Sequence, residues 1–247
     1  MTEASIHEFA DTAADPQVRG FLHTPGSPNN SGLVLTHSAG GNAQAPLLRA
    51  LADTFAANGF TILRCNLPFR QVRSFGPPGP GDAARDRAGL KNAIEAMKKV
   101  QTEGVKDNVG APGLADFARR GNSSQGLLRI FLGGHSYGGR QSSMLCAEEP
   151  DLVAGLLLLS YPLHPPRRPE QQRTQHLPDL RTPTFFVHGT RDPFGSIDEL
   201  QRAMKMIPAR TNLLTMEGAG HDLGFKGGRM DGELPAIVLT DFQSFVD

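Results

Sequence analysis

The sequence contains no tryptophan, and only two cysteines occur among its 247 residues. These two, Cys65 and Cys146, are too few for a disulfide framework, and their spacing matches no metal-ligand motif. Charge of one sign is also missing, because 25 Lys and Arg residues balance 25 Asp and Glu residues. A chain without net charge or a basic stripe is poorly suited to nucleic acid, so we expect no nucleic-acid partner.

Long apolar runs are absent as well. The longest, residues 152–159, is far shorter than the roughly 20 residues that a membrane helix needs, so we expect no membrane partner. The acidic first eight residues lack the charged and apolar regions of a signal peptide, which predicts a cytoplasmic protein. No Walker A, H-E-x-x-H or EF-hand pattern occurs, so we expect no metal and no other cofactor. The sequence leaves open whether the protein is a monomer or a homodimer.

Short apolar runs alternate with longer stretches in which apolar residues recur at helical spacing. The predicted strands are 32–37, 60–65, 127–132, 153–160, 182–188 and 211–216, and the predicted helices are about 47–56, 83–100, 136–149, 196–206 and 234–246. This alternation predicts an α/β fold with three layers (α/β/α) and a mostly parallel sheet, within a single domain spanning residues 1–247. Residues 5–10 and 19–24 are candidates for an antiparallel hairpin at one edge.

Three segments connect these elements without a clear periodic pattern. Residues 66–82 are rich in Pro and Gly, and residues 161–181 are rich in Pro and Arg. The second segment is too short for a helical cap domain, so we expect no large cap and an open cleft between the two loops. Arg70 and Tyr161 on these loops are candidate pocket residues. Residues 104–125 are polar and predict a surface excursion on the face away from the cleft.

One motif carries a clear chemical signal. Residues 134–138 match the pattern G-x-S-x-G, with Ser136 at its centre. The pattern follows a predicted strand and opens a predicted helix, which is the setting of a nucleophile elbow, a strained turn that exposes the serine hydroxyl. The alternative is an ordinary Gly-rich turn. We predict that Ser136 is a nucleophile, and His135 beside it is a candidate pocket residue.

A serine nucleophile needs a base, and the base needs an orienting acid. Asp192 follows the strand predicted to end at residue 188, and His221 follows the strand predicted to end at residue 216. The ends of parallel strands meet at one edge of a sheet, so Ser136, Asp192 and His221 should lie together. The alternatives are a turn aspartate before proline and a surface loop histidine. The order Ser, Asp, His is that of α/β hydrolases.

Acyl transfer also needs hydrogen-bond donors for the developing oxyanion. The loop of residues 36–42 follows the first buried strand, and by position we assign one donor to the backbone N–H of Ala39. Ser38 is the neighbouring candidate, for this role or for the pocket. The second donor is predicted to be the N–H of Tyr137, next after the nucleophile. His37 is expected to brace the loop rather than react.

Several segments together resemble the α/β-hydrolase superfamily, in its dienelactone-hydrolase-like branch. The likeness is carried by residues 35–37, 133–140, 160–166, 173–177, 186–195 and 220–221. More closely, the chain resembles bacterial α/β-hydrolase-like proteins related to animal testis-expressed hydrolase-like proteins. The resemblance spans about residues 30–225 and implies a Ser/Asp/His hydrolase core, but it implies no particular substrate. His135 and Tyr137 stand where these relatives often carry Lys or Arg and Met, which makes this elbow more similar to that of active esterases.

These observations favour a serine hydrolase that cleaves a small-molecule carboxylic ester through an acyl-enzyme. A peptidase, a thioesterase or an acyltransferase would use the same three residues, so these alternatives stay open. A hydrolase-fold binding module without turnover is the alternative from a different class. The step from the three residues to an esterase is partly an analogy with the fold.

Overall fold

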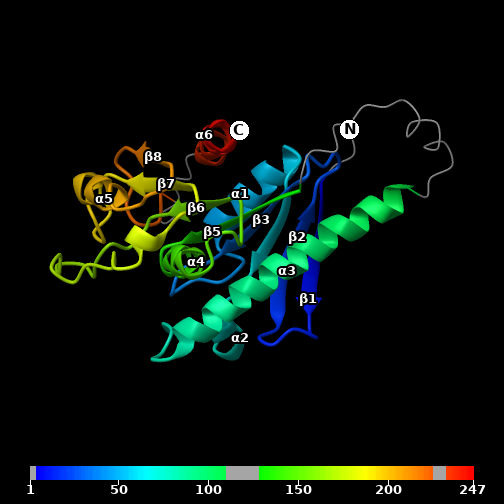
Figure 1. Cartoon of the computed structure of the whole chain (residues 1–247), viewed down its shortest axis with the longest axis horizontal. Helices are drawn as coiled ribbons and strands as arrows, with labels where there is room; N and C mark the ends of the chain where they lie inside the picture. Colours follow the sequence, from blue (N-terminus) through cyan, green and yellow to red (C-terminus); the bar gives the residue numbers. More distant parts are fainter. Residues whose placement is uncertain (1–3, 110–127, 225–231) are drawn as a thin grey trace.

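A computed structural model describes residues 4–109, 128–224 and 232–247 (Figure 1). Within these residues, eight strands form one sheet in the order β1-β2-β4-β3-β5-β6-β7-β8. The strands are β1 (Ser5–Asp11), β2 (Val18–Thr24), β3 (Ser31–Thr36), β4 (Thr61–Cys65), β5 (Arg129–His135), β6 (Gly155–Leu159), β7 (Thr184–Gly189) and β8 (Thr211–Met216). β1 and β2 form the predicted antiparallel hairpin, and the sheet is parallel from β4 to β8.

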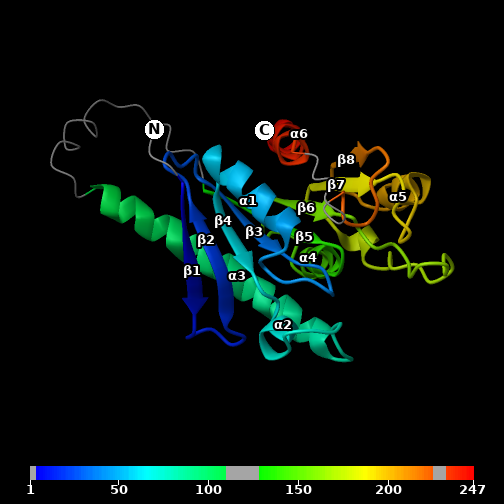
Figure 2. The same ribbon diagram turned by 180° about the vertical axis from the view of Figure 1, so that it is seen from behind.

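Helices cover both faces of the sheet (Figures 1 and 2). They are α1 (Pro46–Ala57), α2 (Pro68–Val72), α3 (Asp82–Val109), α4 (Tyr137–Glu148), α5 (Ile197–Met204) and α6 (Leu234–Val246). Helices α1 and α6 pack on one face, whereas α3, α4 and α5 pack on the other. The predicted three-layer α/β/α fold with a mostly parallel sheet is therefore confirmed.

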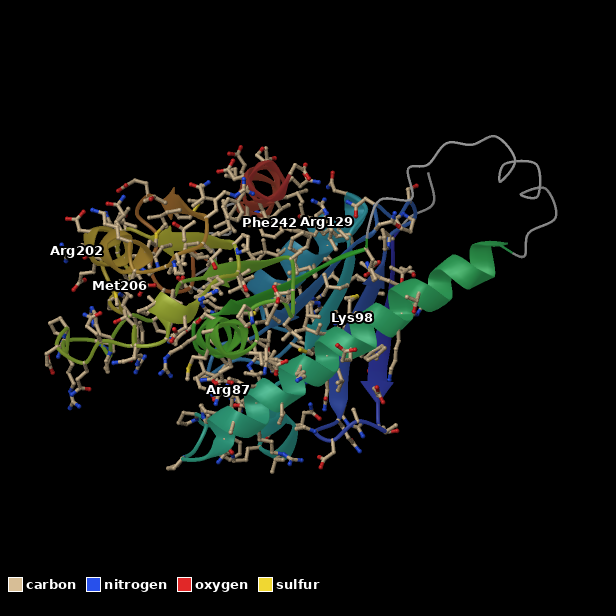
Figure 3. All side chains as sticks on the ribbon, viewed as in Figure 1. Arg87, Lys98, Arg129, Arg202, Met206 and Phe242 are labelled. Atoms are coloured by element: carbon tan, nitrogen blue, oxygen red, sulfur yellow. The ribbon has the colours of Figure 1, made fainter. Side chains whose placement is uncertain are left out.

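The central strands supply apolar side chains to both faces. In β6, Leu156 and Leu158 join the core under α3 and α4, while Leu157 and Leu159 join the core under α1 and α6. Successive side chains of a strand point to opposite faces, so a strand buried on both sides is apolar at every position. Phe242 of α6, labelled in Figure 3, is fully buried in the second core.

Several element boundaries differ from the predicted ones. The Pro/Gly-rich segment 66–82 contains the short helix α2, because Pro68 fits the first turn of a helix and tertiary contacts hold it. Helix α3 continues to Val109, so the predicted excursion begins as helix, and its part from residue 110 on lies outside the described residues. Strand β5 starts at Arg129, two residues later than predicted.

Between β6 and β7 the chain has no large cap, as predicted. That connection holds only the short 3-10 helix η2 (Leu177–Asp179). Loops therefore border the carboxyl ends of the parallel strands. None of the described helices is both long and apolar enough to cross a membrane.

Candidate active site

Ser136 occupies a sharp turn between β5 and α4. Its backbone has φ 53° and ψ −114°, a region that side-chain-bearing residues rarely adopt. Main-chain hydrogen bonds to β6 and to α4 hold this turn. The N–H of Ser136 donates to the Leu159 carbonyl (2.8 Å), and its carbonyl accepts from the Arg140 N–H (2.9 Å). The strained elbow predicted from the sequence is thus fixed by main-chain hydrogen bonds.

Glycines around Ser136 allow the backbone segments to approach closely. A Cβ atom on Gly138 would lie 2.6 Å from the His37 carbonyl oxygen, and one on Gly139 would lie 2.6 Å from the Gly134 oxygen. Real Cβ atoms do not come this close to backbone oxygens, so these glycines let α4 start directly against β5 and the loop after β3. The elbow and the predicted oxyanion loop are therefore neighbours.

The structure brings Ser136, His221 and Asp192 together in a hydrogen-bonded chain. Nε2 of His221 lies 2.7 Å from Oγ of Ser136, and Nδ1 lies 2.8 Å from Oδ2 of Asp192. The Asp192 carboxylate is buried, while the His221 side chain is 22% exposed. Such an arrangement places a proton acceptor on the serine hydroxyl and orients that acceptor through a buried acid.

Phe194 makes two contacts with the Asp192–His221 pair. The second oxygen of Asp192 accepts a hydrogen bond from the backbone N–H of Phe194 (2.8 Å). The ring of Phe194 lies against the imidazole of His221, with 4.1 Å between the ring centroids. Phe194 therefore orients both the acid and the histidine, a role that its sequence context did not indicate.

His188 lies beside the same carboxylate but is engaged elsewhere. Its Nε2 is 3.8 Å from Oδ2 of Asp192, whereas the Gly195 carbonyl is 2.8 Å away and accepts its N–H. Burial lowers the pKa of His188, so the ring is neutral near pH 7. It leaves Asp192 free to interact with His221.

His135, a predicted pocket candidate, is a structural partner of His221. Its Nε2–H donates to the His221 carbonyl oxygen at 2.7 Å. Burial lowers the pKa of His135 to about 4, so the imidazole stays neutral and serves as a single donor here. The structure places this ring behind the histidine, where it holds the loop after β8.

The predicted oxyanion loop is braced by His37, as expected. Nδ1–H of His37 donates to the Ser38 carbonyl (2.8 Å), and Nε2 accepts from the Leu67 N–H (3.1 Å). Burial lowers the pKa of His37 to about 4, which favours the neutral ring that this pairing requires. Gly41 N–H closes a turn onto the same Ser38 carbonyl (3.0 Å), which places Ala39 inside the turn.

Two of the three other pocket candidates, Arg70 and Tyr161, differ from the prediction. Arg70 is 7% exposed, and its guanidinium donates to the carbonyls of Ala39 (2.7 Å), Gly76 (2.8 Å) and Arg73 (3.1 Å). It ties loops together instead of presenting a free charge. Tyr161 is 1% exposed, and its hydroxyl donates to the Arg173 carbonyl (3.0 Å), so it supports the loop from below.

A second serine–histidine pair lies beneath the loops. Oγ of Ser143 is 2.8 Å from Nε2 of His176 and also 2.9 Å from the Arg140 carbonyl. Ser143 is fully buried, and no described carboxylate hydrogen-bonds His176. Burial and the charges of Arg140 and Arg87 (labelled in Figure 3) lower the pKa of His176 to about 4. This pair has neither the exposure nor the acid of the Ser136 site.

Sequence reasoning missed Asp86 on α3. Its side chain is fully buried; Oδ1 accepts from the Phe69 N–H (3.0 Å) and Oδ2 from the Tyr137 hydroxyl (2.7 Å). A signal was present, because Asp86 is four and eight residues before Leu90 and Ile94 and so shares their apolar helix face. Among the described residues, no group of three or more His, Cys, Asp or Glu is placed to hold a metal ion.

Comparison with known proteins identifies the family to which the chain belongs. Residues 29–236 match the family model described as an alpha/beta hydrolase domain. The chain belongs to this family of α/β hydrolases. The membership confirms the predicted resemblance to the α/β-hydrolase superfamily.

Solved structures share the fold of this α/β hydrolase at low sequence identity. A dienelactone hydrolase from Anabaena variabilis superposes with a TM-score of 0.66 at 18% identity, covering 99% of this chain and 98% of that one. An alpha-beta serine hydrolase homologue from Coxiella burnetii gives 0.68 at 18%, covering 95% and 96%. A serine hydrolase without a lid from Xanthomonas campestris gives 0.67 at 13%, covering 99% and 96%. These likenesses establish the fold.

Proposed function

We propose that this α/β hydrolase is a serine hydrolase that cleaves small-molecule carboxylic esters through an acyl-enzyme on Ser136. The observation that carries the proposal is the continuous hydrogen-bonded chain from the Ser136 hydroxyl through His221 to Asp192. The strained backbone of Ser136 supports it, because strain of this kind is kept where function requires it.

In the first half-reaction, Nε2 of His221 takes the hydroxyl proton while Oγ of Ser136 bonds to the ester carbonyl carbon. Asp192 accepts the Nδ1–H, which fixes the tautomer and stabilises the imidazolium that forms. The carbonyl oxygen becomes an oxyanion, and the backbone N–H groups of Ala39 and Tyr137 bind it. When the bond to the leaving oxygen breaks, His221 returns the proton to the alcohol.

In the second half-reaction, a water molecule repeats the attack on the acyl group. His221 takes a proton from the water as its oxygen bonds to the acyl carbon. The ester bond to Ser136 then breaks, the serine oxygen regains a proton from His221, and the carboxylic acid leaves. The connection between β6 and β7 carries no large helical cap, so the alcohol and the acid leave between the loops at this edge of the sheet.

The test is labelling with a fluorophosphonate probe, followed by intact mass, on the wild type, Ser136→Ala and Ser143→Ala. We expect one adduct in the wild type and in Ser143→Ala and none in Ser136→Ala, since Ser143 is the matched serine with a histidine partner. An adduct that survives in Ser136→Ala would identify another nucleophile. No adduct in folded wild type would favour a binding module.

Once Ser136 is labelled, a substrate panel separates the reaction types. Matched ester, thioester and amide substrates with the same acyl chain are compared by kcat/KM. The proposal expects the ester to be the best of the three, with acyl chains of increasing length defining the pocket. A higher kcat/KM for the thioester or the amide would replace the ester assignment.

A further inference from the structure

The proposed mechanism does not use Asp86, although its environment is costly. The carboxylate is fully buried, and burial raises its pKa. No described cation lies within ion-pair distance of it, and both oxygens instead accept hydrogen bonds from neutral donors, Phe69 N–H and Tyr137 O–H. Burying a carboxylate without a cation costs free energy, which hydrogen bonds to the carboxylate offset only in part. The two residues that donate these hydrogen bonds indicate which parts of the structure Asp86 positions.

One donor, Tyr137, follows the nucleophile and carries an amide proposed to bind the oxyanion. Burial and the Asp86 charge raise the pKa of the phenol, so it remains protonated and does not act as an acid. Its ring also packs edge-on against Phe69, at 5.7 Å between centroids and 88° between planes. Hydroxyl and ring together restrict the position of this residue.

The other donor, the backbone N–H of Phe69, connects Asp86 to the segment that contacts Ala39, the residue of the second proposed amide. Phe69 lies on α2, and the next residue, Arg70, donates from its guanidinium to the Ala39 carbonyl at 2.7 Å. The same guanidinium reaches Gly76 and Arg73, so a fork of three carbonyl contacts holds it. One continuous set of contacts thus links Tyr137 to Asp86, Asp86 to α2, and α2 to Ala39.

We propose that Asp86 and Arg70 are positioning residues, which act through helix α2 to set the spacing between the Tyr137 and Ala39 amides. This inference rests on the proposed function, in which these amides bind the oxyanion. Oxyanion donors work only when they are already aimed at the place where charge develops, so two donors on separate loops need a rigid connection. The helix α2, absent from the predicted secondary structure, provides such a connection in addition to the direct packing of Gly138 against the His37 carbonyl.

Kinetics test the proposal with three variants. Tyr137→Phe removes only the hydroxyl, Asp86→Ala removes the acceptor, and Arg70→Lys keeps the charge but not the three-carbonyl fork. Displaced amides weaken transition-state binding, so kcat should fall about tenfold in each variant while KM stays within about twofold. The double variant Tyr137→Phe with Asp86→Ala should lose no more than the worse single variant, because both remove the same bond.

Two further variants separate positioning from general packing. Asp86→Asn keeps the volume, accepts from the Phe69 N–H and donates to the Tyr137 hydroxyl oxygen, so it should restore most of the kcat lost in Asp86→Ala. Tyr161→Phe removes the hydroxyl of the second tyrosine, which is buried and donates to the Arg173 carbonyl. The free energy of unfolding of Tyr161→Phe therefore shows how much stability is lost when a tyrosine hydroxyl and its hydrogen bond are removed. If Asp86→Ala does not fold, Tyr137→Phe alone decides.

Amide hydrogen exchange gives a readout that does not depend on turnover. Exchange should accelerate at residue 137 in Tyr137→Phe and at residue 39 in Arg70→Lys, and at neither residue in Tyr161→Phe. An unchanged kcat in Tyr137→Phe overturns the positioning role when the wild type turns over ester. If the wild type is inert while exchange accelerates, the proposed function fails and the link between the amides stands. If the wild type is inert and exchange is unchanged in the variants, both the proposed function and the link between the amides are overturned.

Discussion

The imidazole of His135 donates a hydrogen bond to the carbonyl oxygen of His221, with 2.7 Å between the two atoms. The residue directly before the proposed nucleophile thus holds the loop that carries the proposed base. The two rings lie 5.3 Å apart, and burial keeps His135 neutral. The position of the base relative to Ser136 therefore depends on the elbow itself, not only on the strand before His221.

Replacing His135 should reduce turnover without removing the nucleophile. His135→Ala leaves the His221 carbonyl without its donor, and we expect kcat/KM to fall about tenfold because the base is less well placed. His135→Gln can still offer an N–H and should retain more activity. Ester hydrolysis and fluorophosphonate labelling rates would show this, and equal rates in all three proteins would contradict it.

Phe194 should matter through its ring. Phe194→Ala removes the surface against which His221 lies, at 4.1 Å between ring centroids, while the backbone N–H to Asp192 remains. We expect kcat to fall about tenfold, with the free energy of unfolding lowered by about 3 kcal/mol. Phe194→Leu fills part of the space, so its kcat and its free energy of unfolding should lie between those of the wild type and of Phe194→Ala. Steady-state kinetics and urea unfolding measure the two effects. An unchanged kcat in Phe194→Ala would contradict a role of the ring in positioning His221.

The elbow should not tolerate a methyl group at Gly139. The Cβ of Gly139→Ala would lie 2.6 Å from the Gly134 oxygen, and backbone on both sides prevents relief. We expect the free energy of unfolding to fall by about 3 kcal/mol, at the upper end for overpacking. Gly40→Ala is the matched control, because a Cβ there meets nothing within 4 Å. Urea unfolding curves of both variants test this, and equal midpoints would contradict the close packing of β5 and α4.

Buried histidines should make the protein acid-sensitive. Burial lowers the pKa of His23, His37, His135 and His176 from 6.5 to about 4, so the unfolded chain binds more protons than the folded one between these values. Stability is then complete above pH 6.5 and is lost as the pH falls toward 4. Each histidine adds a slope of about 1.4 kcal/mol per pH unit within that window. Urea unfolding from pH 4.5 to 7.5 measures the sum.

His23 allows this acid sensitivity to be assigned to a residue. Its Nε2 accepts from Nε of the buried Arg64 (2.8 Å), which only a neutral ring can do. His23→Gln keeps an acceptor without a titrating group, so the slope should fall by about 1.4 kcal/mol per pH unit. His7→Gln, on an exposed histidine of β1, is the control. A slope that stays the same in His23→Gln would assign the proton uptake elsewhere.

The sequence predicted the elbow and the sheet well because their signals are local. A strand, a G-x-S-x-G turn and a helix follow each other within about twenty residues, and the buried strands are apolar at nearly every position. The partners of Ser136 were also accessible, since parallel strands place their following loops at one edge. Helix α2 was not, because the prolines and glycines of residues 66–82 indicate a loop, and the Phe69 amide is held by Asp86, a carboxylate on another helix.

The pocket candidates show where sequence reasoning ends. Arg70 was predicted on a loop but lies on helix α2, and Tyr161 lies on the predicted loop. The direction of each side chain depends on the groups that surround it. Arg70 meets three carbonyls, and Tyr161 meets a carbonyl inside the core. Asp86 was detectable as a charged residue on an apolar helix face, although only the structure shows that Tyr137 is its partner.

The hydrogen bond between Tyr137 and Asp86 has a practical consequence for spectroscopy. The chain has no tryptophan and two tyrosines, so its near-ultraviolet emission arises from Tyr137 and Tyr161. In Tyr161→Phe a single fluorophore would remain, one peptide bond from Ser136 and hydrogen-bonded to a buried carboxylate. Changes in its intensity during a stopped-flow experiment would follow the filling of the cleft in real time, without an attached dye.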